Sequence, residues 1–179
     1  MSNGKWLMLC LLLMASCLQA QKAHVHGKGQ LQVSAEGKQL NILLTLPAMD
    51  VVGFEHAPSS SAQQAAVSEA AERLGNVTGI LMPSADAGCV VQSVKVSSEL
   101  LSIGDKEHHH DHSHDHEHAD FVVEYQFSCG KPELLRQVDL KLFGWLAPLQ
   151  LDAQALTEHG AQVVTLGHRS PTLLLPSAR

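Results

Sequence analysis

Residues 30–46 read QLQVSAEGKQLNILLTL, and this stretch decides the fold class. Apolar and polar residues alternate in Gln30–Ala35 and again in Gln39–Leu46, which is the period of strands with one buried face. Residues 36–38, Glu-Gly-Lys, have the composition of a tight turn. The stretch therefore predicts a β-hairpin that ends near Pro47, because proline lacks the N–H that a strand ladder needs.

One helix and several more strands are expected beyond this hairpin. The serines at 59–61 can cap a helix that runs to about Leu74, and Gly75 is placed to stop it. Strand patterns return at Cys89–Ser98, Phe121–Cys129, Gln137–Phe143, Leu149–Leu156, Ala161–Leu166 and Thr172–Leu175. The sequence predicts a mainly β fold, a β-sandwich-like pair of antiparallel sheets, with one main α-helix and a long His-rich hairpin loop.

Composition limits the classes of function. The chain has 179 residues, which suits one domain once a leader is removed, so residues 21–179 are expected to form a single metal-binding domain. The formal net charge is -6, and lysine and arginine are never grouped. We therefore expect no nucleic-acid surface and no polybasic membrane patch.

The N-terminus has the pattern of an export signal. Lys5 precedes the apolar run Trp6–Ala15, which is too short to cross a bilayer core of about 30 Å as a helix. Residues 1–20 are interpreted as a signal peptide with Ala20 as the last residue before cleavage. In the alternative interpretation, Cys17 is the lipidated N-terminus of a lipoprotein.

Two cysteines, Cys89 and Cys129, remain after cleavage. An even count in an exported chain, with no CxxC motif, favours a disulfide over a pair of metal thiolates. If the strands that hold them pair as an antiparallel hairpin, the two cysteines lie side by side. The low-complexity segment Gly104–Asp120 is then the long, disordered hairpin loop at the opposite end.

That loop carries the strongest chemical signal in the chain. Imidazole suits zinc, copper and nickel, and interleaved carboxylates raise the attraction for a dication. We expect the loop to bind several ions with low selectivity and to release them as histidines protonate near pH ~6.5. The alternatives are a solvated loop of biased composition or an expression tag. Its seven histidines are His108, His109, His110, His112, His114, His116 and His118.

A sparser set is the candidate for an ordered site. His24 and His26 stand one residue apart, so in an extended chain both imidazoles point to the same side. Glu55 and His56 add a carboxylate and an imidazole, a donor set that suits tetrahedral zinc. The alternative for each histidine is a surface or capping role, and this alternative is favoured for His159 and His168.

Catalysis has little support in the sequence. It contains no HExxH motif, no glycine-rich phosphate loop and no nucleophile elbow. Glu55 and His56 could act as acid and base beside a metal-bound water, but nothing else completes such a site. The chain is therefore expected not to be an enzyme.

Two motifs carry a resemblance to a known family. HVHG at 24–27 and PAMDVVGFEHAP at 47–58 are followed by an Ala-rich helix, a His/Asp/Glu-rich insert and an aromatic strand that ends in cysteine. This order resembles the periplasmic zinc-binding proteins of the ZrgA type from Gram-negative bacteria. The resemblance covers nearly the whole mature chain. It implies a periplasmic protein that captures zinc (Zn2+) and assists uptake by an ABC-type zinc transporter.

The expected function follows from the two histidine sets and this resemblance. The insert would collect zinc, and an ordered site near Glu55, His56 and the N-terminal histidine pair would hold it or pass it on. The membrane would be reached only through the transporter or through a lipid at Cys17. The alternatives are a zinc buffer or storage protein, a copper or nickel sensor or chaperone, and a non-catalytic envelope or adhesion domain.

Overall fold

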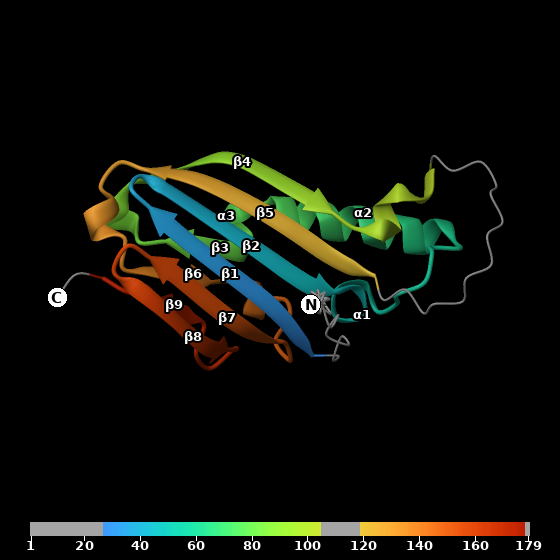
Figure 1. The fold of residues 1–179 in the computed structure, drawn as a ribbon. Coiled ribbons are helices and arrows are strands. Elements are labelled where there is room, and N and C mark those ends of the chain that lie inside the picture. The colour runs from blue at the N-terminus through green and yellow to red at the C-terminus, as the bar shows by residue number, and fades with distance from the viewer. Residues whose placement is uncertain (1–26, 105–118, 178–179) are drawn as a thin grey trace, which may run out of the picture.

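The computed structural model describes residues 27–104 and 119–177. Within these ranges the strands form two sheets, which lie in layers with the helices (Figure 1). The larger sheet has six strands in the order β4-β5-β2-β1-β7-β8, and the smaller has three in the order β3-β6-β9. The fold is therefore mainly β, as predicted.

The elements have the following bounds. The larger sheet contains β1 (Lys28–Glu36), β2 (Gln39–Pro47), β4 (Cys89–Ser97), β5 (Asp120–Cys129), β7 (Gln150–Thr157) and β8 (Gly160–Leu166). The smaller sheet contains β3 (Leu81–Pro83), β6 (Gln137–Leu140) and β9 (Thr172–Leu174). The α-helices are α1 (Ala48–Val52), α2 (Ser61–Gly75) and α3 (Val77–Ile80). Short 3-10 helices are η1 (Ala85–Ala87), η2 (Glu99–Gly104), η3 (Pro132–Leu134) and η4 (Leu142–Gly144).

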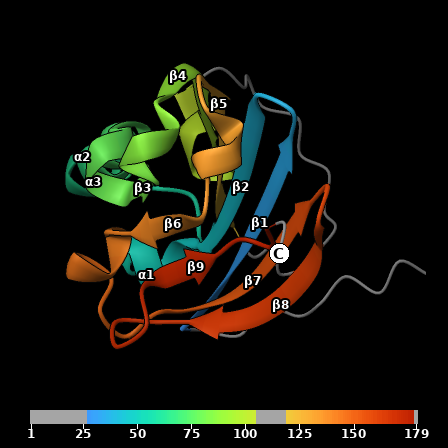
Figure 2. The same cartoon turned by 90° about the vertical axis from the view of Figure 1, so that its left-hand side faces the viewer.

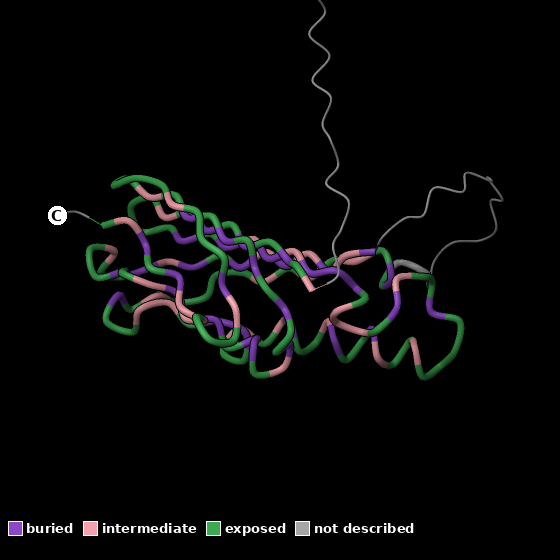
Figure 3. Tube along the Cα trace, turned by 90° about the horizontal axis from the view of Figure 1, so that it is seen from below, coloured by how far each residue is buried: buried purple, intermediate pink, exposed green. Residues whose placement is uncertain are grey.

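The core lies on one face of the larger sheet. Along β2, Leu40, Ile42, Leu44 and Leu46 are buried, while Asn41 between them is exposed, so period-2 patterning separates the two faces. Buried and exposed stretches of the described chain alternate in this way in Figure 3. The helices and the smaller sheet cover the buried face, and the other face carries no layer of described residues (Figure 2). Full burial of each such leucine contributes about 1.5–3 kcal/mol, which makes this layer the main source of stability.

The predicted hairpins are confirmed. β1 pairs with β2, and β4 pairs with β5, both antiparallel. Two details differ from expectation. β1 pairs with β7 in parallel, which alternation alone does not reveal because it has the same period in both kinds of pairing. The strand expected at Gln137–Phe143 ends at Leu140, where the chain turns into η4.

The predicted helix is α2. Ser60 caps it by accepting the Gln63 N–H at 3.2 Å, and the Gln63 side chain accepts the Ser59 N–H at 2.9 Å. Gly75 lies inside the helix, which ends one residue later than expected. The buried Tyr125 hydroxyl donates to the Leu74 carbonyl at 2.7 Å and so joins β5 to the last turn of α2.

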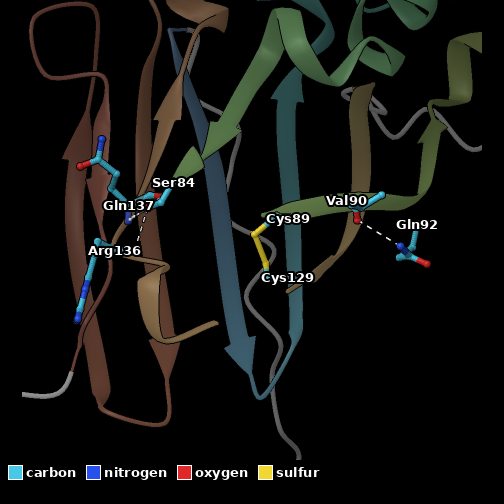
Figure 4. Close-up of a disulfide and its surroundings, with 7 residues drawn as sticks. All are labelled: Ser84, Cys89, Val90, Gln92, Cys129, Arg136 and Gln137. Carbon is cyan, nitrogen blue, oxygen red and sulfur yellow. Dashed lines mark hydrogen bonds between the residues drawn. A yellow bond between two sulfur atoms is a disulfide. The ribbon is translucent and has the colours of Figure 1, made fainter. Parts of the chain in front are cut away.

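Cys89 and Cys129 form a disulfide between directly paired positions of β4 and β5 (Figure 4). The prediction of a disulfide is confirmed, and the alternative of two metal thiolates is wrong. Nearby, the Ser84 hydroxyl accepts the backbone N–H groups of Arg136 and Gln137 at 2.9 and 3.0 Å and so fixes the chain that enters β6 (Figure 4).

The larger sheet has two distinct ends. We call one the disulfide end, where β4 begins, β5 ends, and the turns after β1 and β7 lie. The other is the α1 end, where β1 and β5 begin and β2 passes into α1 (Figure 1). Among the described residues, no helix combines the length and the apolar character that crossing a bilayer requires.

Candidate metal centre

The α1 end brings together chain segments that are far apart in the sequence. Asp120, the first residue of β5, pairs with Pro47, the last residue of β2. One step further, the Ala48 N–H donates to the Ala119 carbonyl at 2.9 Å. The start of α1 is therefore bonded to the residue that directly follows the His-rich insert in the sequence.

The loop after α1 holds Glu55 and His56 between two buried anchors. Gly53 ends the helix with φ of 84°, and its N–H donates to the Met49 carbonyl at 3.0 Å. Phe54 and Pro58 are buried on either side of the pair. Between these anchors, Glu55 is half-buried and His56 is exposed. The local sequence thus presents an imidazole to solvent from a fixed stretch of backbone.

The contacts of His56 define which of its nitrogens can bind metal. Nδ1 lies 2.9 Å from the Ala57 carbonyl oxygen, and a carbonyl only accepts hydrogen bonds, so Nδ1 carries the proton. In the neutral ring the lone pair is then on Nε2. The ring also stacks on Phe54, with centroids 5.2 Å apart and planes at 28°. The hydrogen bond at Nδ1 and the stacking fix the ring and leave Nε2 as the nitrogen that can accept.

Three carboxylates accompany His56 at the α1 end. Glu55 Oε1 and Asp120 Oδ1 are buried from solvent, so both groups are held in the protein rather than extended into bulk water. Asp50 lies in the first turn of α1. The sequence analysis selected Glu55 but missed Asp50 and Asp120. Asp50 is itself part of the quoted motif PAMDVVGFEHAP, and this membership was the signal that could have indicated it, whereas Asp120 had no such signal.

Asp50 fixes the start of β1. Both of its carboxylate oxygens accept the N–H of Gly27, at 2.8 and 3.0 Å. The Gly27 carbonyl accepts the Gln150 N–H at 2.8 Å, from the start of β7. Gly27 has φ of 79°, a left-handed conformation that favours glycine. The residue next to His26 in the sequence is therefore bonded on both sides.

The predicted ligands divide into two groups. The structure places Glu55 and His56 side by side in the chain at the α1 end, whereas the two N-terminal histidines and the seven of the insert lie outside the described residues. Within residues 27–104 and 119–177, no group of three histidine, cysteine, aspartate or glutamate side chains is arranged to hold a metal.

The two histidines favoured as surface residues lie in turns at opposite ends. His159 is exposed in the turn between β7 and β8 at the disulfide end, and its N–H donates to Thr157 Oγ1 at 3.1 Å. His168 follows β8 at the α1 end, with Nδ1 at 3.4 Å from the Phe143 carbonyl oxygen. A Cβ added at the neighbouring Gly167 would lie 3.8 Å from the Leu149 carbonyl oxygen, and the next residue, Gln150, donates its N–H to Gly27.

A groove of about 780 Å³ lies on the open face of the larger sheet. Amide and aliphatic side chains form most of it, and Glu124 is the one carboxylate among the described residues that line it. It contains none of the predicted ligands. A site of this composition does not suit a transition-metal ion, so the groove is not the metal centre. Residues that line it include Gln32, Asn41, Leu43, Gln126, Gln154 and Val163.

The comparison with known families agrees with this chemistry. A family model described as "ZrgA family zinc uptake protein" matches residues 23–175. The chain belongs to the ZrgA family. The resemblance drawn from the two sequence motifs is thereby confirmed. Among curated proteins, no match to the chain was found. The description of the ZrgA family points to zinc and to its uptake.

Proposed function

We propose that this ZrgA-family protein captures zinc in the periplasm of a Gram-negative bacterium and assists its uptake by an ABC-type zinc transporter. One observation carries the metal-site part of the proposal. Gly27, which follows the N-terminal histidine pair, is bonded to Asp50 in α1, and Ala119, which follows the insert, is bonded to Ala48 in α1. Two described residues that border the histidine sets in the sequence are thus bonded to the helix that leads to Glu55 and His56, and this supports the proposal.

The proposed mechanism has two parts. The insert, with seven histidines in eleven residues, collects zinc in several weak sites. An ordered site at the α1 end, built from His24, His26, Glu55 and His56, holds one ion more tightly. The oriented Nε2 of His56 and the half-buried carboxylate of Glu55 supply a donor set that suits zinc.

The first experiment separates the two kinds of site. Replacing the seven insert histidines by serine keeps the chain length and leaves Ala119, which is 3% exposed and bonded to Ala48, in place. In calorimetric titration we expect the zinc stoichiometry to fall and a single tight phase to remain. A control replaces His159, in the turn at the disulfide end, by alanine and should leave the titration unchanged. Unchanged stoichiometry in the serine variant contradicts the role of the insert.

The second experiment tests the ordered site. The variant His56→Ala is made in the chain with the serine insert. The zinc affinity of the tight phase should fall about tenfold to hundredfold, because one of four ligands is removed. Phe54 stays in place as part of the core, so the apo melting temperature should change little. Retention of full affinity by His56→Ala contradicts the proposed ligand set.

The transport step needs a test of its own. Cells without the protein should grow poorly under zinc starvation, and the chain should co-purify with components of an ABC-type zinc transporter. Normal growth together with no such association would instead fit a zinc buffer. Metal content of the protein isolated from cells decides between zinc and copper or nickel, since copper binds most such ligands more tightly in vitro.

A further inference from the structure

We propose that the free edge of β8 is a docking surface for a second copy of this chain, which pairs with it antiparallel across a two-fold axis at Val163. The larger sheets of the two copies then join into one continuous sheet. The inference goes beyond the proposed function, because it adds a partner and does not depend on which residues bind zinc.

β8 is the outermost strand of the larger sheet on the side of β7. Among the described strands of this sheet it pairs with β7 alone, and Figure 2 shows no described element beyond it. Its residues Ala161–Thr165 are all exposed or half-exposed. Alternate residues of an edge strand direct their N–H and C=O groups away from the sheet. β8 therefore offers backbone donors and acceptors to a further strand.

The other edge strands in the described ranges carry features that hinder such pairing. β4 has a bulge between Val91 and Ser93, and it contains Lys95. β3 and β9, the edges of the smaller sheet, have three residues each, and β3 ends in Pro83. Bulges, charges, prolines and short length are the means by which proteins protect their sheet edges. β8 has seven residues, Gly160–Leu166, without a charge or a proline, and its register against β7 is continuous.

Exposed aliphatic side chains accompany this open backbone. Val163 is 76% exposed, and Val164, on the opposite face of the strand, is 38% exposed. Leu156 of β7 pairs with Ala161 and is 60% exposed on the same face as Val163. A second strand beside β8 would remove part of this apolar area from water, which favours the bound state.

The sequence of β8 suits antiparallel pairing with itself. About an axis at Val163, this valine lies opposite its own copy, and Ala161 lies opposite Thr165 of the second copy. None of these side chains is charged, so the pairing brings no like charges together. A closed two-fold contact uses the same patch on both copies, and a strand that complements its own reverse meets this requirement.

The turns on either side of β8 carry opposite charges. Glu158 lies in the turn before the strand and Arg169 in the turn after it, and both are exposed. One oxygen of Glu158 accepts the Gly37 N–H, and the carboxylate keeps its negative charge. Antiparallel pairing sets the acidic turn of each copy beside the basic turn of the other. This charge complementarity favours a second copy in this orientation over an unrelated strand.

The test is the oligomeric state of the purified protein, measured by sedimentation velocity over a range of concentrations. A metal chelator is present throughout, so that association through histidine-bound zinc does not contribute. A one-strand contact belongs to the weak interfaces of less than about 1,200 Å², so the series extends to about 500 μM. We expect a monomer that converts to a dimer as the concentration rises. A monomer at every concentration overturns the proposal.

A pair of variants assigns the contact to β8. Val163→Lys sets two like charges opposite each other at the axis and should raise the dissociation constant of the dimer about tenfold or more. Val90→Lys is the matched control, because Val90 is 63% exposed on β4, at the opposite edge of the same sheet. It should leave the dissociation constant unchanged. Equal weakening by both variants, or none by Val163→Lys, overturns the proposal.

A mixing experiment tests the two-fold axis itself. Val163→Glu alone should weaken the dimer as Val163→Lys does. An equimolar mixture of the two variants should associate again, because lysine and glutamate then lie opposite each other across the axis. A fluorescent label on one variant identifies the mixed dimer. A mixture that stays monomeric overturns the antiparallel pairing at Val163.

Discussion

At the disulfide end of the larger sheet Gly37 donates its N–H to Glu158, and at the α1 end Gly27 donates its N–H to Asp50. Both glycines have positive φ, of 52° and 79°, and both bonds are 2.8–3.0 Å long. The surroundings differ. At the disulfide end the anchored residue sits in a two-residue turn between β1 and β2. At the α1 end it follows His26, one of the proposed ligands, in the chain.

The difference shows that a carboxylate anchor does not define a functional site by itself. Glu158 closes a hairpin turn that is already held by the β1–β2 ladder. Asp50 holds the residue just before β1, whose carbonyl also accepts the Gln150 N–H from β7. The same bond is therefore structural at one end and, in our proposal, part of a metal site at the other. The following variants test that distinction.

The largest expected effect is at the disulfide end. Changing both Cys89 and Cys129 to serine should lower the free energy of unfolding by about 4 kcal/mol, because the bond closes a loop of 40 residues in the unfolded chain. The tight zinc affinity should stay the same, because the bond lies at the far end of β5 from α1. Denaturant unfolding and a zinc titration of the folded variant check the two parts. A loss of zinc affinity in the folded double variant would contradict the claim that zinc binding at the α1 end is independent of the disulfide end.

A second variant perturbs the packing next to the α1 end. A Cβ at Gly29 would lie 2.8 Å from both the Thr45 carbonyl oxygen and the Leu151 side chain, so Gly29→Ala forces β1 away from its neighbours. We expect a loss of about 2 kcal/mol in unfolding free energy and weaker zinc binding. Gly144→Ala is the control, because its Cβ would meet no described atom within 4 Å. Equal melting temperatures for the two variants would contradict the close packing described.

A third variant lowers stability in the middle of the sheet and so controls for global effects. Tyr125→Phe removes the buried bond to the Leu74 carbonyl and should cost about 1–2 kcal/mol without changing zinc affinity. Burial raises the pKa of Tyr125 above its usual value of about 10. The unfolded chain loses this proton above pH 10 while the folded protein keeps it, so stability falls as pH rises.

The chain has one tyrosine, so the variant isolates this alkaline loss. The wild type should have a higher free energy of unfolding than Tyr125→Phe at pH 8, and this difference should shrink as pH rises to about 11. Only the wild type loses stability through Tyr125. A difference in free energy of unfolding that stays constant with pH would show that Tyr125 keeps an ordinary pKa in the fold. A drop in zinc affinity in Tyr125→Phe would show that zinc binding follows global stability rather than the α1 end.

Much of the fold could be predicted from alternation and from two cysteines. The period-2 patterns in Gln30–Ala35 and Phe121–Cys129 placed four strands of the larger sheet in the correct pairs, and the antiparallel register brought Cys89 to Cys129. The parallel pairing of β1 with β7 was not predicted, because a side-chain pattern shows which face is buried and not which strand is the neighbour.

The candidate site was less predictable for the same reason. Glu55 and His56 were selected from residue type and motif, whereas Asp50 gained its importance only when strand order placed Gly27 beside α1. Asp120 was assigned to the loop, yet it pairs with Pro47 as the first residue of β5. The choice of Nε2 in His56 depends on a carbonyl one residue away, which residue type does not encode.

The smallest expected effect compares the two glycines directly. A Cβ added at Gly27 or at Gly37 would meet no described atom within 4 Å, so alanine at either site is opposed by backbone conformation and not by space. A left-handed residue with a Cβ costs roughly 1–2 kcal/mol, so both variants should lose similar stability. Gly27→Ala alone should also weaken zinc binding, because a relaxed φ moves the peptide that Asp50 holds. Equal zinc affinity in the two variants, measured at matched apo stability, would mean that the α1 end is an ordinary strand terminus and that the N-terminal histidines reach zinc without it.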